Sequence, residues 1–143
     1  MPMIDVYAPA GTFADEHALA VAMATAVMRI EQVPDIAMFR TNTAAFVHST
    51  SAFANVDGDA DHVRVQVLTN AGALDRPKQL AVVARLTELI AEAAGDESLK
   101  DRTWVLLTEA APGGWGLHGH AHTNEELVAA ARAELAALAR PAP

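Results

Sequence analysis

The chain contains no cysteine, so disulfide bonds and thiolate chemistry are excluded, and we expect a cytoplasmic protein. Basic residues are also few. Ten Lys and Arg stand against 18 Asp and Glu, which gives a formal net charge of −8. This charge argues against nucleic acid or an anionic membrane as a partner. Any anionic substrate would need cations gathered locally at its site.

Long apolar runs are absent as well. Charged residues interrupt each apolar segment before it reaches the ~18 consecutive apolar residues that suggest a membrane span. The chain does not open with a basic segment followed by an apolar one, so we expect no secretory signal. Hydrophobic residues make up 52% of the 143 residues and charged residues 20%, which is typical of one compact domain over 1–143.

Within this chain, two strand–helix–strand units follow one another, over about 2–61 and 62–120. In the first unit, the hydrophobic pattern predicts a strand over 3–8, an amphipathic helix over about 13–31 and a strand over about 36–47. Thr12 and Asp15 form a capping-box pattern ahead of this helix. A small, polar segment at 49–61 predicts a surface loop.

The second unit repeats this plan. Alternating valines from Val63 predict a strand, Asp75 caps a helix that Gly95 ends, and 103–109 is a further strand. A glycine-rich hairpin follows, and Thr123 begins a last helix to about residue 139. These elements predict an α+β fold with two layers, in which tandem units form a four-stranded sheet with two helices on one face. Apolar residues on both strand faces suggest oligomerisation across the uncovered face.

The first residues of the chain carry the most distinctive chemistry. Methionine before a small residue is usually removed, so we expect the mature chain to begin with Pro2. A prolyl N-terminus is a secondary amine in a rigid ring. An α-amino group titrates near pH 8, and burial lowers the pKa of an amine further. Pro2 is therefore a candidate base or nucleophile near neutral pH.

Pro2 opening a strand, a turn with glycine and a long amphipathic helix together form a pattern that resembles the tautomerase superfamily. The strand Thr-Trp-Val-Leu-Leu-Thr-Glu, followed by a hairpin with Trp115 and Gly116-Leu-His-Gly119, is similar to the same family. The length resembles its fused members. The resemblance implies a homotrimer, a catalytic Pro2, an active-site aromatic at Trp115 and no cofactor.

The family's substrate-binding arginines do not match this chain. Thr12 and Phe39 stand at the positions that the resemblance assigns to them. Arg40, one residue further along, is a candidate. Four neutral or aromatic residues complete the candidate substrate site: Asn42, Asn70, Trp115 and His118.

The resulting hypothesis is a cofactor-independent tautomerase that moves a proton on an enol or keto acid-type small molecule. Three alternatives remain open. The first is a hydratase, dehalogenase or decarboxylase of the same superfamily. The second is a trimeric binding protein without catalysis. The third is a metal-binding module, because His118, His120 and His122 alternate and would share one face of an extended segment. We expect no metal at the Pro2 site.

Overall fold

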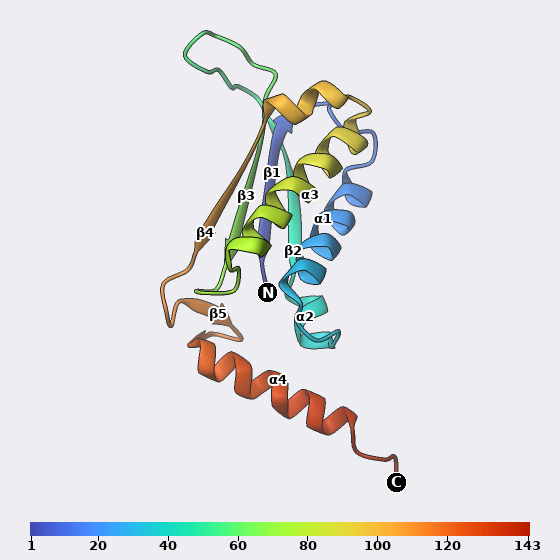
Figure 1. Cartoon of the computed structure of the whole chain (residues 1–143), viewed down its shortest axis with the longest axis vertical. Coiled ribbons are helices and arrows are strands. Elements are labelled where there is room, and N and C mark those ends of the chain that lie inside the picture. Colours follow the sequence, from blue (N-terminus) through green and yellow to red (C-terminus); the bar gives the residue numbers. More distant parts are fainter.

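In the computed structural model, which describes residues 1–143, a twisted sheet carries two long helices on one face (Figure 1). The strands are β1 (Met3–Pro9), β2 (Ala44–Thr50), β3 (Val63–Thr69) and β4 (Thr103–Glu109), in the order β2-β1-β3-β4. β1 pairs with β2 and β3 with β4 in parallel, whereas β1 and β3 are antiparallel. The predicted α+β fold and its four-stranded sheet are confirmed.

The covering helices are α1 (Glu16–Glu31) and α3 (Arg76–Ala94). Each begins at an aspartate, Asp15 or Asp75, whose side chain accepts a hydrogen bond from a backbone N–H in the first turn. α1 begins three residues later than predicted, because Asp15 caps it, whereas Thr12 donates to the Pro9 carbonyl in the preceding turn. The core lies between helices and sheet and includes Ile4, Val6, Met23, Val65, Leu86 and Ile90.

The predicted strand over 36–47 is wrong in its first half. Residues Ala37–Thr41 form a short helix, α2, and the strand β2 begins only at Ala44. Side chains hold this turn of helix in place. The Thr41 hydroxyl donates to the Ala37 carbonyl at 2.7 Å, and the Asn42 amide donates to the Met38 carbonyl at 2.7 Å. Both contacts join residues four apart, which is the spacing of about one helical turn.

A hairpin follows β4, as predicted, and consists of β5 (Trp115–Leu117) and β6 (His120–His122). His118 and Gly119 connect these strands with φ angles of 52° and 75°. Positive φ at both central residues is the requirement of a tight two-residue hairpin turn. His118 therefore lies in the turn, so the expected single extended face for three histidines is wrong.

The last helix, α4 (Asn124–Leu138), begins at the predicted capping box of Thr123 and Glu126. It crosses the end of the sheet where the N-terminus lies (Figure 1). Only Leu127 and Ala131 of this helix are buried. Its other anchors are polar, since the Glu134 carboxylate accepts from the Met38 backbone N–H at 3.3 Å and the Asn124 amide donates to the Ala71 carbonyl at 2.7 Å.

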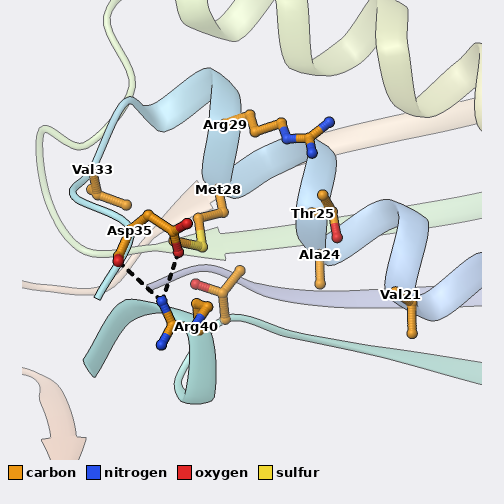
Figure 2. A pocket seen from close by; sticks show the side chains of 9 residues that line it. Val21, Ala24, Thr25, Met28, Arg29, Val33, Asp35 and Arg40 are labelled. Atoms are coloured by element: carbon orange, nitrogen blue, oxygen red, sulfur yellow. Dashed lines mark hydrogen bonds and ion pairs between the residues drawn. The ribbon is translucent and has the colours of Figure 1, made fainter. Parts of the chain in front are cut away.

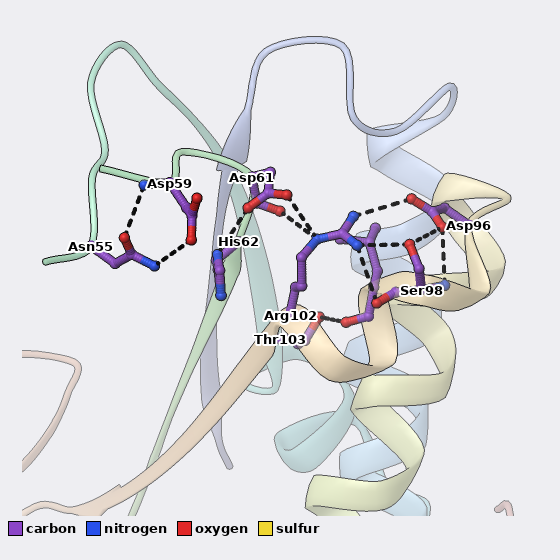
Figure 3. Close-up of polar contacts among 9 residues, drawn as sticks. Asn55, Asp59, Asp61, His62, Asp96, Ser98, Arg102 and Thr103 are labelled. Atoms are coloured by element: carbon purple, nitrogen blue, oxygen red, sulfur yellow. Dashed lines mark hydrogen bonds and ion pairs between the residues drawn. The ribbon is translucent and has the colours of Figure 1, made fainter. Parts of the chain in front are cut away.

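At the opposite end of the sheet, the loop between β2 and β3 extends away from the body (Figure 1). Arg102, in the 3-10 turn η1 (Glu97–Arg102) before β4, joins the base of this loop to the helical layer. Its guanidinium pairs with Asp61 at 3.2 Å and Asp96 at 3.3 Å (Figure 3). None of the helices is both long enough and apolar enough to span a membrane.

Candidate active site

The chain begins inside the protein, at the end of β1 that α4 covers (Figure 1). Pro2 is fully buried, and its carbonyl accepts a hydrogen bond from the Ala44 N–H at 3.2 Å, which fixes it to the start of β2. Met1 is 1% exposed and packs with Trp115 and Leu127 in a small apolar cluster separate from the main core. The first residue of the chain and the hairpin aromatic are thus in contact.

The charge of the N-terminus is matched by a buried carboxylate. Glu31, the last residue of α1, is 7% exposed, and its two side-chain oxygens lie 3.2 Å and 3.4 Å from the Met1 amino nitrogen. Burial lowers the pKa of the Met1 amino group, and the charge of Glu31 offsets part of this effect. An amine at this position is therefore more often neutral near pH 7 than one in water.

A cavity of about 420 Å³ lies directly beside Met1 and Glu31. The segments around it are the end of α1, the turn after β3 and the inner side of α4. Asn70 lines it from the turn after β3 and Arg132 from α4. The Arg132 side chain is exposed, so it lies at the mouth. Sequence reasoning missed both Glu31 and Arg132.

The predicted site residues fall into three places. Trp115 packs against Met1, and Asn70 lines the cavity beside it. Asn42 and His118 line a neighbouring groove between α2, the hairpin and α4. Arg40 lies elsewhere: it lines a cavity of about 510 Å³ between α1 and α2, where it pairs with Asp35 at 2.8 Å (Figure 2).

The displacement of Arg40 follows from the correction to the second strand. In α2 its side chain points toward Asp35, whose backbone and side-chain oxygens both accept from its guanidinium (Figure 2). The guanidinium of Arg40 is also half exposed and already paired, so it is not positioned to meet a substrate beside Pro2.

The histidines of the hairpin do not form a metal cluster. His120 pairs with Glu126 at 3.2 Å, and a ring nitrogen of His122 lies 3.0 Å from the His120 carbonyl oxygen. No group of three or more His, Asp or Glu side chains in the chain is arranged to hold a metal ion. The metal-binding alternative therefore has no support from this geometry.

Neither a protein-family model nor a curated protein matches the sequence. Solved structures do match. The protein Pt0534, inactivated by 2-oxo-3-pentynoate, has a TM-score of 0.71 and 16% identity, over 87% of this chain and 98% of that one. A wild-type fused 4-OT in a symmetric trimer has a TM-score of 0.68 and 18% identity, over 82% and 93%. The chain has the tautomerase-superfamily fold.

A third structure with this tautomerase fold broadens the comparison. It is N1, a member of the cis-3-chloroacrylic acid dehalogenase family, with a TM-score of 0.65 and 16% identity over 88% of each chain. Identities of this size establish the fold, whereas the reaction must be argued from the residues of this chain.

Proposed function

We propose that this protein, once Met1 is removed, is a cofactor-independent tautomerase in which the Pro2 amine is the general base and acid. The observation that carries the proposal is the burial of the N-terminus at the start of β1, beneath an apolar wall and beside a cavity. Tautomerase-fold neighbours support a small-molecule substrate and an isomerase of this superfamily.

The mechanism follows from the environment of the amine. Removal of Met1 vacates the space between Trp115 and Leu127, which adjoins the 420 Å³ cavity, and leaves the Pro2 nitrogen at its floor. The burial that lowers the pKa of the Met1 amino group acts at the same end of β1. A partly neutral Pro2 amine takes a proton from the carbon beside a carbonyl, or from an enol, and returns it to the other atom.

A keto acid-type substrate would place its carboxylate toward solvent. Arg132 is the one cationic side chain that lines the cavity, and it lies at the mouth on α4. Asn70 offers its unpaired side-chain oxygen as an acceptor, while its amide nitrogen donates to the Asn124 side-chain oxygen at 3.4 Å. The apolar wall of Trp115 and Leu127 keeps water from the amine.

We further propose a cytoplasmic homotrimer, with the uncovered face of the sheet as the interface. This face carries Phe46, Trp104 and Leu106, which are 49%, 40% and 44% exposed. These side chains lie on the two edge strands, β2 and β4, with Asp5, Arg64 and Gln66 between them, and large apolar side chains exposed on a sheet face are typical of a surface that another chain covers. A fused 4-OT neighbour is a symmetric trimer, and oligomers of one chain are generally symmetric.

The decisive experiment compares Pro2→Ala with wild type in the tautomerisation of phenylenolpyruvate, after intact mass has shown that Met1 is absent. General acid–base catalysis contributes about 10²- to 10⁴-fold, so we expect a loss of that size in kcat/KM. Pro141→Ala, in the exposed C-terminal tail, is the matched control. Equal rates for Pro2→Ala and wild type, or a retained Met1, would rule out this mechanism and favour a binding protein.

A covalent probe gives independent evidence. The neighbour Pt0534 is inactivated by 2-oxo-3-pentynoate. We expect this reagent to add once to the processed chain, at the peptide that begins with Pro2. Peptide mass spectrometry locates the addition, and labelling confined to Lys or His side chains would contradict the proposal.

A further inference from the structure

Glu31 has no part in the proton transfer assigned to Pro2, and yet its carboxylate is buried beside the site. Its only ion pair is with the Met1 ammonium, at 3.2 Å. Taking a carboxylate out of water costs several kcal/mol unless a well-placed cation compensates. The inner end of this site is therefore arranged to hold a positive charge.

Removal of Met1 takes this cation away. Arg132 lines the same cavity at its mouth but makes no ion pair with the Glu31 carboxylate. The Pro2 nitrogen is separated from the Met1 nitrogen by two backbone atoms, and the bond from Ala44 N–H to the Pro2 carbonyl holds Pro2 in place. Lys78 donates to the backbone carbonyl of Glu31 at 3.0 Å and makes no ion pair with its carboxylate. After removal of Met1, the ammonium group of a ligand can therefore occupy this position beside Glu31.

A second acceptor lines the same cavity. The side-chain oxygen of Asn70 is buried and has no hydrogen-bond partner. Its orientation is set by neighbours: the Asn124 amide nitrogen donates to the Ala71 carbonyl at 2.7 Å, so the Asn124 oxygen is free to accept from the Asn70 amide nitrogen at 3.4 Å. A buried carbonyl oxygen without a donor is costly, and an ammonium group of a ligand would satisfy it.

The positions of the other Met1 atoms suggest which further groups such a ligand would have. Its carbonyl carbon is bonded to the Pro2 nitrogen, so this carbonyl and the carbon beside it mark the space next to that amine. Its side chain is buried against Trp115 and Leu127. The first residue of the unprocessed chain thus places an ammonium, a carbonyl and an apolar chain within one site.

We infer that the processed site binds a small carbonyl compound with a primary ammonium on the adjacent carbon and an apolar chain about as long as that of methionine. Glu31 and Asn70 hold the ammonium, and Trp115 and Leu127 hold the apolar chain. This inference rests on the proposed function, because both require removal of Met1. The carbon that bears the ammonium is next to the carbonyl, so it is also the carbon whose proton Pro2 would remove.

Calorimetric binding of two amides to the processed protein tests this inference. L-Methioninamide carries the ammonium, and 4-(methylthio)butanamide lacks only that group. Hydrogen bonds to charged groups are worth more than neutral ones, so we expect L-methioninamide to bind at least about tenfold more tightly. In Glu31→Gln this preference falls to about twofold or less, while 4-(methylthio)butanamide still binds, which shows that the site is folded.

Glu16→Gln, the same substitution at the exposed start of α1, is the matched control and should keep the full preference. Equal binding of the two amides by wild type would overturn the inference, as would a preference that survives Glu31→Gln. Calorimetry needs no proton transfer. A protein that prefers the ammonium and has no tautomerase activity would therefore refute the proposed function alone, and the opposite result would refute this inference alone.

Discussion

Replacing Leu127 with alanine tests how α4 is held over the N-terminal site. Leu127 is 4% exposed, and only one other residue of α4, Ala131, is buried. Truncation of a buried leucine costs about 2–5 kcal/mol. The polar anchors of the helix, including the bond from the Met38 N–H to Glu134, contribute about 1–3 kcal/mol each. The loss from this one truncation is therefore a large share of the docking energy of α4, about as much as its two polar anchors contribute together.

Hydrogen exchange followed by mass spectrometry measures this effect segment by segment. A docking energy lowered by about 2–3 kcal/mol raises the exchange rates in 124–138 by about 30- to 140-fold, because each 1.4 kcal/mol is a factor of ten. The amides of β1 and β3 should keep their protection. Leu138→Ala, at a side chain that is 67% exposed, is the control and should change little. Unchanged protection of α4 in Leu127→Ala would refute this account of the helix.

Three further predictions follow from other parts of the fold. Asp75→Ala removes the cap of α3 and should lower the free energy of unfolding by about 1 kcal/mol, measured by urea denaturation, whereas the exposed Asp101→Ala should change it little. Phe46→Glu should reduce the proposed trimer to smaller species in light scattering, and Val56→Glu, in the loop, should not. In a chain that keeps Met1, the pKa of the Met1 amino group is lower in the folded protein than in the unfolded chain. Between the folded and the unfolded pKa the unfolded chain therefore binds more protons, so the free energy of unfolding should rise with pH in that interval, which lies below about 8. A free energy of unfolding that falls with pH there would contradict this prediction.

Local patterns predicted most of the fold because the local chemistry is sufficient there. Asp75 and Thr123 cap their helices with their own side chains, and the alternation of Val63, Val65 and Val67 requires only that one face of the strand be buried. The strand prediction over 36–47 was wrong in its first half because Met38 and Phe39 fit a strand as well as a helix. What decides its shape is a set of contacts between residues four apart, which hydrophobicity does not record.

The site was harder to predict, since it joins residues that are distant in sequence. Trp115 was predicted through the family resemblance, and in the structure it packs against Met1. Glu31 follows Leu19, Met23 and Val27 at steps of four on α1, so its place on the buried stripe was a signal that the polar residue type concealed. Arg132 left no such signal, because its position depends on how α4 docks across the end of the sheet.

The burial of Met1 also determines which end of the chain tolerates additions. A fused peptide before Met1 would turn its ammonium into a neutral amide, leave Glu31 without its cation and force the chain out between Trp115 and Leu127. The α4 helix would have to lift away to let it pass. Pro143, by contrast, lies in an exposed tail. An N-terminal tag that stays attached would thus change the candidate site and the docking of α4 and would keep Pro2 from becoming the first residue, whereas a C-terminal tag would leave these features intact.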